Sequence, residues 1–172
     1  MVEIESAVSV CPGCALALPP STTASYDGYY HVSAECWSVY TEVLAADFSN
    51  VVLFGQAHQL TVDTYAVQHA GGGHNPKSVC VHLVGLHLQI EEGLPGPLAS
   101  RCIQRFASRR STAWPRFSLP RERSSLTVGD VARASDAEEH VATVRLWAHD
   151  VWESWSHVHD DVATIVYDEG LL

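Results

Sequence analysis

The chain has 172 residues, of which 47% are hydrophobic, and this composition suits a single domain that buries a core of its own. Its formal charge of −10, from 20 acidic and 10 basic residues, would repel a phosphate backbone and argues against nucleic acid as a partner. The acidic start Met1–Glu5 lacks a signal-peptide pattern, and no apolar run approaches the roughly 20 residues that cross a bilayer. We therefore expect a cytoplasmic protein with no membrane partner.

The N-terminal segment, residues 10–34, is rich in Pro, Gly, Ser, Thr and Tyr and reads as a loop. It contains the knuckle Cys11-Pro12-Gly13-Cys14, in which two thiols are separated by two residues. Such a pair can bind one tetrahedral ion, because the turn between the cysteines lets both sulfurs point inward. The five cysteines are odd in number and follow no export signal, so we expect reduced thiols rather than disulfides.

Two helices are predicted next along the chain. Over residues 34–48, Trp37, Tyr40, Leu44 and Phe48 recur at steps of three and four, which predicts a helix with these side chains facing the core. The period breaks over residues 50–57. A second helix is predicted over residues 57–69, with both of its histidines, His58 and His69, on one face, and it ends at a run of three glycines.

The remaining predicted helices cover residues 76–91, 98–108, 128–133 and 135–167. Pro76 suits the first turn of the helix that it opens, and Ser135 and Glu138 are spaced as a capping box at the start of the last helix. The segment 110–126 has no clear period and is predicted to be an irregular connection, and its length makes it a candidate flexible loop or active-site cover.

These elements predict a mainly α fold, a helical bundle-like single domain over residues 1–172 with an irregular N-terminal zinc-knuckle segment. Within it we distinguish the knuckle segment 10–34, a helical core 35–108, an irregular connection 109–134 and a long C-terminal helix 135–167.

A closed structural zinc site requires four protein ligands, so two residues must join Cys11 and Cys14. Cys36 opens the first predicted helix and His58 opens the second, and both could fold back onto the knuckle. We therefore predict a Cys3His zinc site made of Cys11, Cys14, Cys36 and His58. Taken alone, Cys36 is equally well explained as a small buried side chain, and His58 as a capping or solvated histidine.

A second arrangement stays open, in which His69 and His82 approach each other through the glycine loop and form an open site with a water ligand. His58 and His69 are about 16 Å apart along a continuous helix, so one ion cannot bind both. Either His69 serves another site or the helix is broken. In both cases we predict a ligand pocket near Tyr65, Gln68, His69 and His82.

No nucleotide-binding or hydrolase motif is present, and no catalytic residue can be named. The leading hypothesis is a zinc protein that binds or transforms a small molecule. The alternatives are a zinc-stabilised interaction module without enzymatic activity and a module that senses metal or thiol oxidation. A coordination sphere of four protein ligands would favour a scaffold, whereas three ligands and water would favour catalysis.

One stretch of the chain is basic, and its arginines are Arg101, Arg105, Arg109, Arg110, Arg116, Arg121 and Arg123. Guanidinium groups suit carboxylate or phosphate ligands. The simpler interpretation is a solvated surface.

At the knuckle, at Cys36-Trp37 and at the segment His58–His69, the chain resembles a bacterial domain family of unknown function. Its members share a CPxC knuckle, a cysteine before an aromatic helix and an HxLxVxxYxxQH segment. The resemblance extends over nearly the whole chain and implies a metal-binding domain, but it implies no catalytic residue. Two positions depart from the pattern, because Ala15 stands where such knuckles often have glycine and Ala70 stands where proline is typical.

Overall fold

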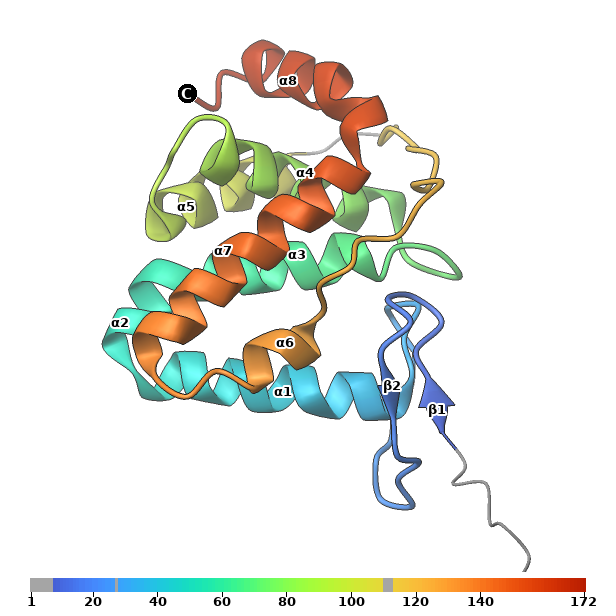
Figure 1. Ribbon diagram of the computed structural model, residues 1–172. Helices are drawn as coiled ribbons and strands as arrows, with labels where there is room; N and C mark the ends of the chain where they lie inside the picture. Colours follow the sequence, from blue (N-terminus) through green and yellow to red (C-terminus); the bar gives the residue numbers. More distant parts are fainter. Residues whose placement is uncertain (1–7, 27, 110–112) are drawn as a thin grey trace, which may run out of the picture.

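The computed structural model describes residues 8–26, 28–109 and 113–172. Within these ranges, helices account for most of the regular structure (Figure 1), and the prediction of a mainly α protein is confirmed. The acidic start Met1–Glu5 and Arg110 of the basic stretch lie outside the described residues.

The knuckle lies in a short hairpin at the N-terminal end of the described chain. Strands β1, Ser9–Val10, and β2, Ala17–Leu18, pair antiparallel, with Ser9 opposite Leu18. Residues 11–16 form the turn between them. The hairpin sits beside the first turn of α1 (Figure 1), and within its turn Cys11 and Cys14 are buried while Pro12 and Ala15 are exposed.

Helix α1, Ala34–Ser49, begins at Ser33, whose side chain accepts a hydrogen bond from the backbone N–H of Cys36. Its buried residues are Cys36, Tyr40, Val43 and Asp47. Tyr40 faces the core as predicted, but the other three buried positions each lie one residue before the predicted ones, and Phe48 itself is 64% exposed. The displacement arises because the helix buries a thiol and a carboxylate that have polar partners.

The predicted break over residues 50–57 is wrong, because this segment is helical. Asn50 caps α2, Val51–Leu53, by accepting hydrogen bonds from the N–H groups of Val52 and Leu53. A π-helical turn, Phe54–His58, then continues directly into α3, Gln59–Gln68. The π turn adds a residue to the helical repeat, which disturbs the hydrophobic period.

Helices α4, Pro76–Ile90, and α5, Gly96–Ala107, follow close to the predicted positions. Asn75 caps α4, and Pro76 occupies its first turn. Helix α4 packs against α3, α5 and α8, and its middle turns are fully buried. It is therefore the central helix of the core.

The long C-terminal helix predicted over residues 135–167 is interrupted. Helix α7, Ala137–Ser154, ends before Trp155, and a 3-10 turn, Ser156–Val158, leads into α8, His159–Asp168. His159 stabilises this bend, because its Nε2 donates to the carbonyl of Trp152 at 3.0 Å and its ring stacks on that indole at 3.9 Å. The apolar period survives the bend, so it did not reveal the interruption.

The start of α7 is one residue later than predicted. Asp136 is the N-cap and accepts a hydrogen bond from the N–H of Glu139, and Glu139 in turn accepts from the N–H and hydroxyl of Ser135. A similar reciprocal cap opens the short α6, Val128–Ala132, where Thr127 and Asp130 exchange hydrogen bonds with each other's backbone.

Residues 113–126, here called the strap, connect α5 to α6 along the chain and have no regular structure. They cross the face of α3 (Figure 1). One carboxylate oxygen of Asp150 on α7 accepts hydrogen bonds from the N–H groups of Ser125 and Leu126, each 2.7 Å long. His157 donates to the carbonyl of Ser118 at 2.9 Å. The strap is therefore tied to α7 and to the bend that follows it rather than left free.

Among the described residues, no helix combines the length and the apolar character that crossing a bilayer would demand.

Candidate metal centre

Four donor atoms from three separate parts of the fold meet beneath the N-terminal hairpin. Cys11 and Cys14 come from its turn, Cys36 from the first turn of α1, and His69 from the residue that ends α3. All four donor atoms lie within 4.8 Å of one another, and all four residues are buried. The group could therefore hold a metal ion.

Two of the donor distances agree with the edges of a tetrahedral site. Bonds of about 2.3 Å to sulfur and about 2.05 Å to nitrogen give edges of about 3.8 Å between two sulfurs and about 3.6 Å between sulfur and nitrogen. The Sγ atoms of Cys14 and Cys36 are 3.8 Å apart, and Cys36 Sγ is 3.5 Å from Nε2 of His69. These three donors are therefore spaced as ligands of one ion.

The orientation of His69 is set by its own helix. Its Nδ1 lies 2.8 Å from the backbone carbonyl of Tyr65, one turn earlier. A carbonyl can only accept, so Nδ1 carries the proton and Nε2 presents its lone pair to the sulfurs. The backbone carbonyl of His69 also accepts a hydrogen bond from the N–H of His31, which ties the end of α3 to the loop before α1.

The knuckle turn is closed by its backbone. The N–H of Cys11 donates to Leu16, and the N–H of Ala15 donates to Cys11. Ala15 has a φ of 62°, in the left-handed region where glycine is usual. A side chain on Gly13 would lie 2.5 Å from the ring of His69, so this position has no room for one.

Tyr65 covers the side of Cys36, with its hydroxyl 3.6 Å from the sulfur. Its ring stacks on Tyr40 at a centroid distance of 3.7 Å and is fully buried. Both aromatic residues shield the group from water. Tyr65 therefore supports the site without adding a ligand.

The three thiols influence one another's ionisation strongly. A hydrogen bond from Cys14 lowers the pKa of the Cys11 thiol well below its usual range. Hydrogen bonding to Cys11 raises the pKa of Cys14 to about 12, and contact with both partners raises that of Cys36 further still. One thiolate is thus stable in the group by itself. A bound cation would offset the repulsion that opposes ionisation of the second and third thiols.

His58, the predicted fourth ligand, is not part of this group. It lies about three helical turns before His69 on the same helical run, with its Nδ1 3.5 Å from a carboxylate oxygen of the fully buried Asp47. The other oxygen of Asp47 accepts a hydrogen bond from His140 at 2.9 Å. Burial alone would raise the pKa of Asp47, but these two histidines outweigh it and leave the pKa lowered. His58 therefore contacts a buried carboxylate.

Replacing His58 with alanine is expected to leave the metal content unchanged, because His69 occupies the fourth corner. The free energy of unfolding should fall by about 1 kcal/mol, the usual contribution of a partly exposed polar contact. Elemental analysis and urea unfolding would measure both quantities. Loss of the metal in His58→Ala would contradict this assignment.

The four residues predicted to line a ligand pocket lie in different parts of the structure and have different partners. Tyr65 and His69 belong to the metal group. His82 Nδ1 lies 2.7 Å from the fully buried Asp63, and Gln59 and Gln89 donate to the same carboxylate. Burial raises the pKa of Asp63. His82 and His69 thus have different hydrogen-bond partners, Asp63 and the carbonyl of Tyr65.

Gln68 holds the strap in place. Its amide nitrogen donates to the hydroxyl of Ser124 and the carbonyl of Leu126, each at 2.7 Å. Its amide oxygen accepts a hydrogen bond from the indole of Trp147 at 3.1 Å. Among the four predicted pocket residues, only Gln68 lines the cavity described next.

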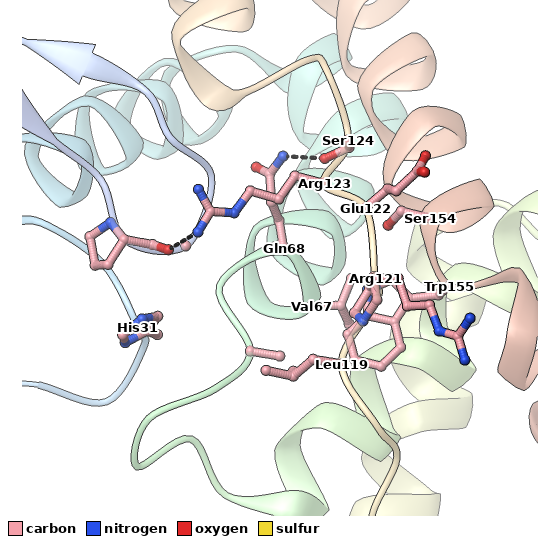
Figure 2. Close-up of a pocket in the computed structure, with 14 residues that line it drawn as sticks. His31, Val67, Gln68, Leu119, Arg121, Glu122, Arg123, Ser124, Ser154 and Trp155 are labelled. Carbon is pink, nitrogen blue, oxygen red and sulfur yellow. Dashed lines mark hydrogen bonds between the residues drawn. The ribbon is translucent and has the colours of Figure 1, made fainter.

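A cavity of about 330 Å³ lies directly beside the knuckle (Figure 2). Pro12 and Gly13 form one side of it, the end of α3 forms its floor, and residues 119–124 of the strap form the other side. Trp155, at the bend after α7, closes the end away from the knuckle. The cavity exists only because the hairpin, α3 and the strap are held together.

The fold and the site define a helical protein with a buried Cys3His group that could hold a metal ion. The model of DUF5946, a family of unknown function, matches residues 9–156, and the chain belongs to that family. The matched range includes the knuckle, all four grouped residues and the strap. No curated protein and no solved structure matches the chain.

Proposed function

We propose that the protein is a zinc-binding module in which the ion has a structural role, and that its function is to bind a small molecule in the cavity beside the knuckle. The observation that carries the structural role is the closure of the site. Four buried protein donors within 4.8 Å of one another would fill a tetrahedral coordination sphere and leave no position for water or substrate.

The donor set favours zinc over other metals. Three thiolates and one imidazole are soft and borderline ligands, which select Zn²⁺ over Mg²⁺ or Ca²⁺, and tetrahedral sulfur-rich geometry is typical of zinc. The ion would join the hairpin to α1 and α3, and would add to links such as the hydrogen bond from Ser9 to Glu35.

Burial of the sulfurs argues against a redox sensor. Sensor cysteines are accessible to oxidants, whereas Cys11 and Cys36 are fully buried and Cys14 is 4% exposed. In the proposed role the thiols are protected from oxidation by the same packing that holds the ion.

Protein purified under reducing conditions is expected to contain one zinc per chain. X-ray absorption at the zinc edge should give a first shell of three sulfurs at about 2.3 Å and one nitrogen at about 2.05 Å. A shell with an oxygen from water would contradict a structural role and indicate a catalytic one. Protein that neither retains zinc nor takes it up after reduction would overturn the proposal.

A further inference from the structure

The cavity beside the knuckle is bordered by cationic side chains with spare hydrogen-bond donors. Arg123 extends toward the knuckle and donates one bond, 3.0 Å long, to the carbonyl of Pro12, which leaves its other donors free. Arg121 also borders the cavity, but its guanidinium extends past Trp155, away from Arg123 (Figure 2). His31 lies on the same side of the cavity as Pro12 and the guanidinium of Arg123 (Figure 2).

The neutral polar groups of the cavity are already engaged. Gln68 uses both its amide nitrogen and its amide oxygen within the protein. The hydroxyl of Ser154 donates to the carbonyl of Val151 at 2.6 Å. The donors left for a ligand are therefore mainly the charged ones.

One carboxylate, that of Glu122, also borders the cavity, but Figure 2 shows it directed away from Arg123 and toward the opposite edge. Two arginines and one histidine therefore border the cavity together with one glutamate. The basic residues at the cavity outnumber the acidic ones, whereas the whole chain has a formal charge of −10. Local charge, rather than net charge, decides what a small cavity attracts.

The rest of the lining is apolar. Val67, Leu119 and the buried indole of Trp155 lie on the side of the cavity away from Pro12 (Figure 2). A lining of this kind suits a hydrophobic body, and a few placed donors then fix its orientation. The volume of about 330 Å³ allows a ligand the size of a substituted single ring.

We infer that this cavity binds a small organic anion, with its carboxylate or phosphate at Arg123 and its apolar part against Leu119 and Trp155. Guanidinium groups favour these planar or tetrahedral oxyanions. The inference rests on the proposed binding function and names the ligand's chemical class.

The site also depends on the metal centre. Pro12 and Gly13, which line the cavity, lie between two of the cysteines, and Arg123 is held by the carbonyl of Pro12. Metal binding fixes this turn, so it also fixes one side of the cavity and the position of the guanidinium. Anion binding and metal binding should therefore strengthen each other.

The test uses the full chain with its metal and follows amide and indole resonances by NMR. Benzoate and phenyl phosphate serve as anionic probes, and benzamide serves as the uncharged match of benzoate. We expect the anions to shift the resonances of Gly13, Ser124 and the Trp155 indole, and to bind about tenfold more tightly than benzamide. Equal affinity for benzoate and benzamide would overturn the inference.

Variants then locate the anion. Arg123→Gln should weaken benzoate binding about tenfold. Arg116→Gln, which removes the same charge from the strap outside the cavity, should not. If Arg116→Gln weakens binding as much as Arg123→Gln, the attraction is general and the proposed site is wrong.

Zinc content is measured in every sample, which separates this inference from the proposed role of the metal. A protein with one zinc that binds neither benzoate nor phenyl phosphate refutes the anion site alone. Chelation of the metal should reduce benzoate affinity at least fivefold. Unchanged affinity after chelation would refute the coupling.

Discussion

Replacing Cys36 with alanine is expected to abolish metal binding and to lower the melting temperature by about 10 °C or more. Cys36 joins the knuckle to α1, and its sulfur has both Cys14 and His69 as neighbours. Without it, the remaining donors cannot close a tetrahedron, and the hairpin loses its strongest link to the helices. A loss of about 5 kcal/mol corresponds to a shift of this size in a chain of this length.

Cys102→Ala is the matched control. Cys102 is also buried, but it lies on α5 and is not part of the metal group. Its replacement should keep one metal per chain and cost only the packing of a small side chain. Metal analysis and calorimetry would give both quantities, and full metal content in Cys36→Ala would refute the assigned site.

Chelation of the native protein should reproduce the effect of Cys36→Ala. Removal of the ion leaves three thiols in contact, of which only one ionises readily because each thiolate opposes the next. The hairpin should then separate from α1, while the core around α4 remains packed. Hydrogen exchange would show faster exchange at residues 9–18 and unchanged protection in α4.

Gly13→Ala is expected to weaken metal binding at least tenfold although it removes no ligand. The added methyl group would lie 2.5 Å from the backbone carbonyl of His31 and 2.5 Å from a ring carbon of His69. Neither contact is sterically acceptable, and both neighbours are held, His69 by Tyr65 and His31 by the end of α3. The knuckle or the imidazole must therefore move away from the ion.

Gly73→Ala provides the comparison for Gly13→Ala. Gly73 lies in the loop after α3, has no atom within 4 Å of the added methyl group, and has no positive φ. It should bind the metal as the native protein does. Competition against a zinc chelator of known affinity would measure both variants, and equal affinities would show that the close packing at Gly13 does not matter.

Parts of the site could be recognised before the fold was known. The two-residue separation of Cys11 and Cys14 is a local property, and a thiol in the first turn of the following helix is close to the knuckle by chain length alone. The structure brings these three sulfurs together. No long-range information was needed for that expectation.

The fourth donor could not be chosen in the same way. His58 and His69 lie on one helical segment, and the choice between them depends on which part of that segment lies beside the hairpin. The uninterrupted course of α2, the π turn and α3 places His69 in that part. The sequence signal that pointed to it was the four-residue step from Tyr65, which allows the carbonyl of Tyr65 to orient the ring.

The hydrophobic period did not predict the inward positions of a helix where polar groups are buried. In α1 the inward positions include Cys36 and Asp47, whose partners come from α3, the π turn and α7. At the bend after α7, a histidine replaces a lost helical hydrogen bond, so the apolar spacing continues across the interruption. The polar partners of these buried groups come from segments distant in sequence, and the hydrogen bond at the bend depends on side-chain geometry. A pattern of hydrophobicity holds no information on either.

By itself, the amino-acid sequence determined the helical class, most helix positions and the knuckle, because these depend on local spacing, capping and turn residues. Tertiary structure decided which histidine faces the sulfurs, where the long helix bends, and that the strap and the knuckle enclose a cavity bordered by arginines. Those features depend on the direction in which each helix packs, and that direction is set by contacts among segments far apart in the chain.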